Sequence, residues 1–116
     1  MAVALEELYR EVEPMYDMHL VTKSCFHKVI EWTHIVENPE FIELLHGDEL
    51  IFSAGIQYTS EEWLMDFVQR LIEAGTGGLV LSLHEGSCYP QRIVGYCNRK
   101  KFPLFSSGWK TPYLDV

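Results

Sequence analysis

Positive charge is scarce in this sequence, which has 9 Lys and Arg against 17 Asp and Glu and a formal net charge of -8 at pH 7. A domain of this sign repels phosphate backbones. We therefore expect the chain alone to bind neither DNA nor RNA nor an anionic membrane. No apolar run approaches the roughly 20 residues of a membrane span, and the start, with Glu6, Glu7 and Glu11, is too acidic for a signal peptide. We expect a cytoplasmic protein.

Cysteine is also scarce. The three residues, Cys25, Cys88 and Cys97, are an odd number without a C-x-x-C spacing, which argues against a disulfide framework and against a zinc ribbon. We expect reduced thiols, with Cys97 packed on the apolar face of a helix. The five histidines show neither H-E-x-x-H nor H-x-x-x-H on one helix face, so we predict no metal site.

Motifs for nucleophilic catalysis and for phosphate binding are missing. Ser82, His84 and Glu85 have the residue types of a hydrolytic triad, but they are near neighbours at one strand end, and no G-x-S-x-G elbow occurs. The glycines of residues 75–78 follow a predicted helix instead of preceding one, so they cannot direct amides at a phosphate. We predict that the protein is not an enzyme and has no cofactor.

The composition is that of a packed protein. With 116 residues, 47% of them hydrophobic and 13% aromatic, the chain is long enough to bury somewhat over about 60% of its unfolded surface in one domain. Disorder is excluded for most of its length.

The first third of the chain alternates between helical and extended patterns. Residues 6–12 have apolar positions at helical spacing, and Pro14 is expected to stop that helix. Residues 18–22 are predicted to be extended. Residues 29–36 are apolar and rich in β-branched side chains, which predicts a mostly buried strand.

A short helix should begin at Asn38 and Pro39. The Asn side chain can accept a hydrogen bond from an unpaired backbone amide of the first turn, and Pro is tolerated at the first helical position because the amide there is unpaired in any case. We expect Gly47 to end this helix in a left-handed conformation. Residues 49–53 are predicted to form a strand, and the acidic residues 48–49 before it are interpreted as part of a solvated turn.

The strongest helical pattern comes next. Thr59 and Glu62 have the spacing of a capping box. The apolar face of the helix, from about residue 60 to residue 74, comprises Leu64, Phe67, Val68, Leu71 and Ile72. Residues 79–83 are predicted to be a buried strand, Pro90 to open another helix, and residues 103–106 to form the last strand. The alternation of strands and helices predicts an α/β fold, a single three-layer domain with a mainly parallel sheet flanked by helices.

Polar or small residues follow all four predicted strands. Because ligands of open parallel sheets bind outside the carboxyl ends of the strands, a small polar ligand would bind there. The candidate ligand-binding residues are Glu37, Ser53, Gly55, Ser82, His84 and Ser106. The alternative is structural, since any α/β sheet turns into its loops with residues of this kind.

Glu37 is the sharpest of these candidates. Its carboxylate could bind a donor on a ligand, or it could accept backbone amides at the helix start or in a loop. Glu31 and His34 interrupt the apolar pattern before it, so we expect them to face a sheet edge, a subunit contact or each other.

The ordered pattern of residues resembles the N-terminal domain of the purine catabolism regulator (PucR) family of bacterial transcription factors, over roughly residues 18–116. In the first half the resemblance rests on Trp32, His34, Val36, Glu37, Leu45, Gly47, Glu49, Leu50 and Gly55. In the second half it rests on Phe67, Leu71, Ala74, Gly75, Gly78, Leu79, Pro90, Pro103, Leu104, Asp115 and Val116.

The resemblance implies a regulatory, effector-sensing module, with residues 1–17 as a helical extension before a regulatory domain of residues 18–116. DNA would be bound by a helix-turn-helix region that this chain does not contain. The sequence departs from the family pattern at residues 53–54 and 106–110, both at strand ends. The ligand is therefore expected to differ from that of purine-responsive relatives.

Two hypotheses follow. In the first, a small polar metabolite binds at the strand ends and shifts a conformational or oligomeric equilibrium. In the second, the domain is a protein-interaction or dimerisation module without a small ligand, and its partner is a second copy in a homodimer or another protein.

Overall fold

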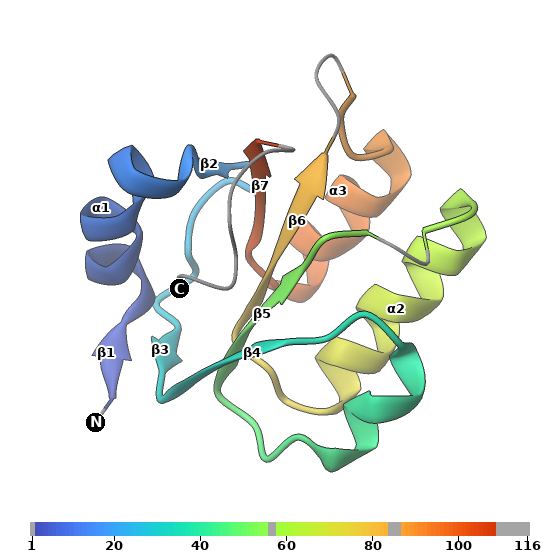
Figure 1. Cartoon of the computed structure of the whole chain (residues 1–116), viewed down its shortest axis with the longest axis horizontal. Helices are drawn as coiled ribbons and strands as arrows, with labels where there is room; N and C mark the ends of the chain where they lie inside the picture. Colours follow the sequence, from blue (N-terminus) through green and yellow to red (C-terminus); the bar gives the residue numbers. More distant parts are fainter. Residues whose placement is uncertain (1, 56–57, 84–86, 109–116) are drawn as a thin grey trace.

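The computed structural model describes residues 2–55, 58–83 and 87–108 (Figure 1). In chain order the elements are β1 (Val3–Ala4), α1 (Leu5–Tyr16), β2 (His19–Leu20), β3 (Val29–Ile30), β4 (Trp32–Ile35), the 3-10 helix η1 (Pro39–Leu44), β5 (Glu49–Ser53), α2 (Glu61–Glu73), β6 (Gly78–Leu83), α3 (Gln91–Lys100) and β7 (Leu104–Gly108).

A five-stranded sheet in the order β2-β7-β6-β5-β4 forms the centre of the molecule. Strands β4, β5, β6 and β7 are parallel, and β2 is antiparallel to β7. The register aligns Phe52 with Val80 and Val80 with Phe105, so these side chains share one face of the sheet. The mainly parallel sheet of the predicted α/β fold is confirmed.

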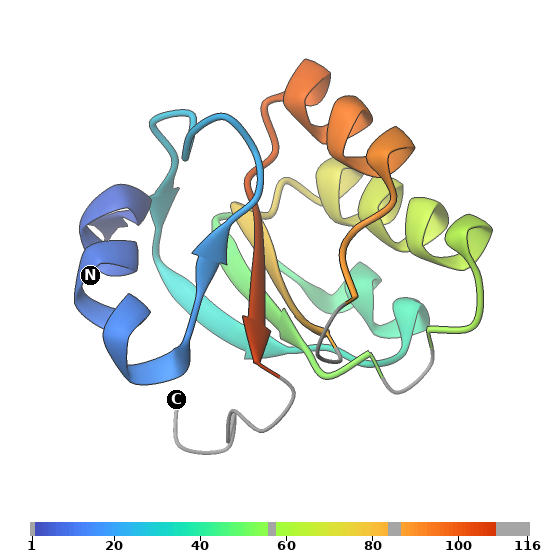
Figure 2. The ribbon, with the colours of Figure 1, turned by 90° about the horizontal axis from the view of Figure 1, so that it is seen from above.

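Both faces of the sheet are covered (Figure 2). Helices α2 and α3, together with η1, pack on one face around a core that includes Ile51, Leu79, Leu81 and Leu104. On the other face, α1 packs against Leu50, Phe52, Val80 and Phe105, beside the two-stranded antiparallel sheet of β1 and β3. The predicted three layers are therefore present.

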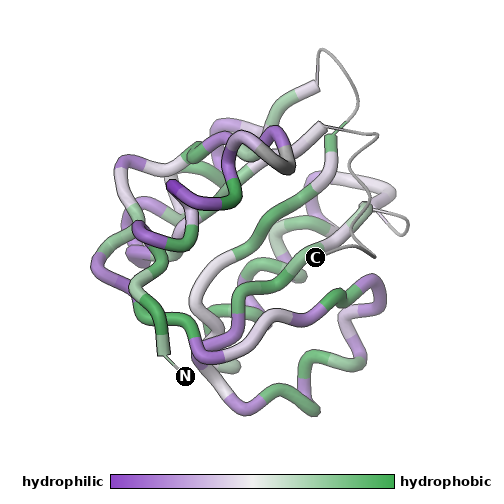
Figure 3. Tube along the Cα trace, turned by 60° about the vertical axis from the view of Figure 1, so that its left-hand side comes forward, coloured by the Kyte–Doolittle hydropathy of each residue, from purple (hydrophilic) through white to green (hydrophobic). Residues whose placement is uncertain are grey.

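Helix α1 is longer than predicted, because Pro14 lies within its last turn and the helix continues to Tyr16. A proline there removes one backbone hydrogen bond, and Asp17 then ends the helix with a left-handed φ of 50°. In Figure 3 the helix carries both hydrophilic and hydrophobic positions, whereas the central strands are mainly hydrophobic. Its apolar side packs onto the sheet through Leu5, Leu8, Tyr9 and Val12.

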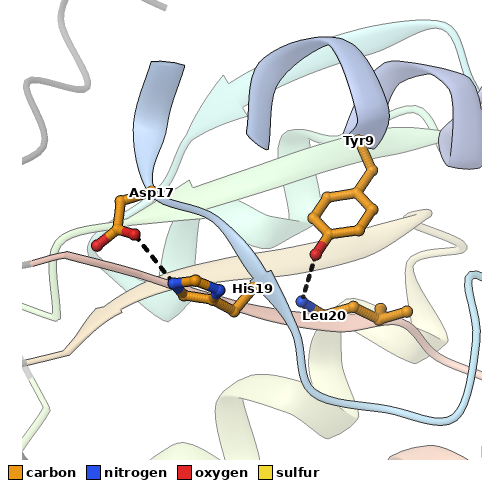
Figure 4. Close-up of polar contacts among 4 residues, drawn as sticks. All are labelled: Tyr9, Asp17, His19 and Leu20. Atoms are coloured by element: carbon orange, nitrogen blue, oxygen red, sulfur yellow. Dashed lines mark hydrogen bonds and ion pairs between the residues drawn. The ribbon is translucent and has the colours of Figure 1, made fainter. Parts of the chain in front are cut away.

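A polar contact ties α1 to the first strand of the large sheet (Figure 4). The Tyr9 hydroxyl accepts the backbone N–H of Leu20 at 3.1 Å. At the end of the helix, His19 Nε2 lies 3.0 Å from a carboxylate oxygen of Asp17. The segment predicted as an N-terminal extension is thus in direct contact with the sheet.

The prediction of one buried strand over residues 29–36 is wrong in two respects. The segment divides into β3 and β4, which belong to different sheets, and all four residues of β4 are exposed. Strand β4 is the outer strand of the large sheet, so among the described residues it has no neighbouring strand on one side. The expectation that Glu31 and His34 face an edge fits this position, since both are exposed.

The helix start at Asn38 is confirmed, because its side chain accepts the backbone N–H of Glu40 at 3.0 Å. The helix is of the 3-10 type and ends at Leu44, with Leu45 extended after it. Gly47 has the predicted positive φ, 102°, but it lies in the turn before β5 and does not end the helix. The strand predicted over residues 49–53 is confirmed as β5.

Helix α2 is confirmed, with Leu64, Phe67, Val68 and Leu71 buried. Its N-cap is Ser60, whose hydroxyl accepts the backbone N–H of Trp63 at 3.1 Å, and not the Thr59 of the predicted capping box. Within the described residues, no helix has both the length and the apolar character needed to cross a membrane.

Candidate functional site

The carboxyl ends of β4 and β5 are joined by Glu37. Its carboxylate accepts the Ser53 hydroxyl at 2.9 Å and the backbone N–H of Ala54 at 2.8 Å. The Ser53 hydroxyl in turn accepts the backbone N–H of Gly55 at 3.1 Å. The structure therefore brings three of the candidate residues together, and the carboxylate of Glu37 is engaged in the loop after β5.

Beside this link a cavity of about 290 Å³ opens at the carboxyl ends of β5 and β6. We call it the strand-end cavity. It is lined by Ala54, Gly55, Tyr58, Ser82, Leu83, Ser87 and Cys88. Gly55 has a φ of 72°, which favours glycine at this position.

Tyr58 forms one wall of the strand-end cavity. Its ring stacks on that of Trp63 with the centroids 6.0 Å apart, and Trp63 in turn contacts Phe67 in the core. Burial raises the pKa of the Tyr58 phenol above its ordinary value, and nearby Glu61 and Cys88 add to the rise. The phenol is therefore protonated at neutral pH and can donate a hydrogen bond as well as accept one.

The candidate residues do not all meet at the strand-end cavity. Ser82 lines it, and its hydroxyl donates to the carbonyl of Gly108 at 3.3 Å. Ser106 pairs with His19 and Leu81 in the middle of β7, because that strand continues to Gly108 instead of ending at residue 106 as predicted. His84 lies outside the described residues.

The lining of the strand-end cavity is polar but uncharged among the residues that the structure describes. Hydroxyl groups come from Ser82, Ser87 and Tyr58, and a thiol comes from Cys88. Such groups can donate to and accept from a small neutral ligand. In the same described ranges, no three His, Cys, Asp or Glu side chains are grouped so that they could hold a metal ion.

A larger hollow, of about 520 Å³, lies between η1 and the end of α2. Its charged lining residues are Glu43, Arg70 and Glu73, and Arg70 is already paired with Asp66 at 2.9 Å. The residues that line it include none of the candidate residues. We therefore regard the strand-end cavity as the better candidate for a ligand site.

Sequence reasoning missed the cavity residues Tyr58, Leu83, Ser87 and Cys88. All four lie within five residues of the end of β5 or in the segment that begins at the end of β6. Their position after these two strands was the available signal, but the prediction selected the residues nearest to each strand end.

Comparison with protein families identifies a match. The family model described as the purine catabolism regulatory protein-like family matches residues 10–116. No curated protein and no solved structure matches the chain. The family match covers nearly the whole sequence, all four parallel strands and the strand-end cavity among them. We conclude that the chain belongs to the purine catabolism regulatory protein-like family, which its pattern of residues had predicted.

Proposed function

We propose that this domain is an effector-sensing regulatory module, and that a small, uncharged polar metabolite binds in the strand-end cavity. The observation that carries the proposal is a cavity lined by hydroxyl groups at the carboxyl ends of parallel strands, in a chain of a regulatory family. Ligands of open parallel sheets bind at such ends. DNA contact would then belong to a helix-turn-helix region outside this chain.

The size of the strand-end cavity limits the ligand. Its volume of about 290 Å³ is at the lower end of the range for ligand pockets. Ser82 and Tyr58 can fix the orientation of a ligand by hydrogen bonds, while the backbone at Gly55 permits close approach because it carries no side chain. A neutral heterocycle or a similar small polar molecule fits these constraints.

Binding would be transmitted through the link at Glu37. The same loop supplies Ala54 to the strand-end cavity and its backbone N–H to Glu37. A ligand that moves this loop therefore changes the contact between the ends of β4 and β5. Regulation requires that the ligand bind two states of the domain with different affinities.

The test is a thermal-shift screen with neutral purine bases, their breakdown products and amino acids. A compound that binds only the folded state raises the melting temperature, and the rise grows with the ratio of its concentration to its dissociation constant. For a compound that does so, we expect Tyr58→Phe and Ser82→Ala to weaken binding about tenfold, the equivalent of about 1.4 kcal/mol. Thr59→Ala is the matched control, since Thr59 is an exposed hydroxyl residue beside the cavity but not in its lining.

Glu37→Gln separates a ligand role from a structural one. Glutamine keeps the shape of the side chain, but one of the two accepting oxygens becomes an NH₂ group, which cannot accept a hydrogen bond. One of the hydrogen bonds from Ser53 and Ala54 is therefore lost, and we expect the unfolding free energy to fall by about 1 to 2 kcal/mol. Glu40→Gln, at an exposed position, is the control. If the Glu37 variant binds a confirmed effector as tightly as the parent, Glu37 takes no part in ligand binding.

The second candidate function is that of an interaction module without a small ligand. It is favoured by the exposed apolar side chains on β4 and η1, Trp32 at 57% and Leu44 at 72% exposure among them. If no compound in the screen raises the melting temperature while the chain associates with a protein partner, this second function replaces the first.

A further inference from the structure

Exposed apolar side chains gather at one edge of the molecule. In the part of the chain that the structure describes, the large hydrophobic residues with high exposure are Val29, Trp32, Ile35, Phe41 and Leu44. All five lie within residues 29–44, which form β3, β4 and η1. We call them the β4 edge patch. Large exposed apolar side chains that are concentrated in one segment of a folded protein point to an interaction site.

The two edges of the large sheet differ in how they are protected. Strand β2 has two residues, and a very short edge strand offers little for another chain to pair with. Strand β4 has four residues, Trp32 to Ile35, all of them exposed. None of the four is Lys, Pro, Asp or Glu, the residues with which natural proteins block edge pairing.

The side chains of β4 project from both faces of the strand. Trp32 is in register with Glu49 and Ile35 with Phe52, so these two side chains lie on opposite faces. Only a partner that adds a strand at the edge covers both at once. On the side of β1 and β3, a hollow of about 370 Å³ lined in part by Leu8, Ile30 and Trp32 is open to side chains of such a partner.

We propose that the partner is a second copy of this chain, paired through β4 as an antiparallel neighbour across a two-fold axis. Antiparallel pairing of identical strands across a two-fold axis brings the β4 edge patches of both copies into one interface. It also brings no carboxylates into opposition within the strand, since the ionisable side chain of β4 is His34. This inference goes beyond the proposed effector binding and does not depend on it.

The apolar surface of the β4 edge patch approaches the area that a dimer interface needs. Its side chains are between 48% and 72% exposed, which for large side chains of about 150 to 200 Å² gives roughly 400 to 500 Å² of apolar surface on each copy. Two copies contribute about 900 Å². Thr33, His34 and the backbone of β4 add to this and bring the total toward the roughly 1,200 Å² at the lower limit of specific interfaces.

Sedimentation equilibrium of the 116-residue chain tests the proposal. We expect the parent at about 100 μM, where even micromolar association is populated, to have twice the monomer mass of 13.5 kDa. Trp32→Lys and Ile35→Lys should each weaken association at least tenfold. Both positions are exposed, so the circular dichroism spectrum and the melting temperature of the dilute protein should not change. Leu44→Lys, at 72% exposure, serves if either variant fails to fold.

Gln69→Lys is the matched control, because it adds the same charge at an exposed position of α2 outside the β4 edge patch, and it should remain dimeric. Added salt should strengthen the dimer, since it screens the repulsion between two chains of net charge -8. A parent that is monomeric at this concentration, or Trp32→Lys and Ile35→Lys variants whose dimer dissociation constants equal that of the parent, would overturn the proposal. A dimer that salt dissociates would also overturn it, because it would be held by charge and not by the apolar edge.

Discussion

The buried carboxylate of Glu49 accepts the backbone N–H of Gly47 at 2.7 Å, and its second oxygen accepts that of His46 at 2.6 Å. Glu49 is 0% exposed, so the interpretation of residues 48–49 as a solvated turn is wrong for this residue. Its neighbour Asp48 is exposed, as that interpretation requires. The first residue of β5 thus holds the turn that leads into it.

Replacing Glu49 should therefore destabilise the fold. In Glu49→Ala the two amides lose a charged acceptor in a buried site, and we expect a loss of about 2 to 4 kcal/mol in the free energy of unfolding, measured by urea denaturation. Asp48→Asn is the control, since Asp48 is exposed with a φ of 63° that asparagine tolerates. A Glu49→Ala protein as stable as the parent would show that the two hydrogen bonds contribute nothing.

Phe67 lies at the centre of the contact between α2 and the sheet. It is 0% exposed, so Phe67→Ala should cost about 3 to 5 kcal/mol in unfolding free energy. The same change at Phe41, which is 59% exposed, should cost less than about 1 kcal/mol in dilute solution. A cost below about 1 kcal/mol at Phe67 would contradict the packing described here.

Stability should fall at alkaline pH because of Cys97. Burial raises the pKa of its thiol from 9.0 to about 12. Since the folded pKa is the higher one, the thiol contributes stability that is complete below about pH 9 and is lost as the pH rises toward 12. Burial also raises the pKa of Cys25. Between about pH 8 and about pH 10.5, the free energy of unfolding in urea should decline less in Cys97→Ala than in the parent. Equal declines in the two proteins would exclude a contribution of the Cys97 thiol to the pH dependence.

The isolated chain should show no sequence-specific affinity for DNA. Its net charge of -8 opposes contact with a phosphate backbone. Fluorescence titration with labelled promoter DNA at low and high salt measures this. Site-selective binding that weakens with salt would contradict the expectation.

The sequence predicted those elements in which local signals agree. In α2, the apolar residues Leu64, Phe67 and Leu71 recur at helical spacing, and in β5 the strand is short and bounded by turns. The prediction of a buried strand failed at β4, because an apolar strand at a sheet edge has the same composition as a buried one. Only the strand order, which depends on tertiary contacts, distinguishes the two.

The site was predicted in part for a similar reason. The approach of Glu37 to Ser53 follows from two adjacent parallel strands that end side by side. Ser106 was misplaced because β7 extends two residues further than its apolar run indicates. The contribution of Tyr58 depends on the path of the loop after β5, for which the residues carry no periodic pattern.

The order of the strands has a consequence for folding. Consecutive strands from β4 to β7 pair with each other, whereas β2 pairs with β7. Close to this pairing, the Thr22 hydroxyl accepts the backbone N–H of Leu104, which lies 82 positions further along the chain. The first strand of the large sheet in chain order, β2, therefore has to wait for β7, which is made much later. Closure of this long loop is entropically unfavourable until the rest of the sheet exists, so we expect β2 to join the sheet only after synthesis has passed β7.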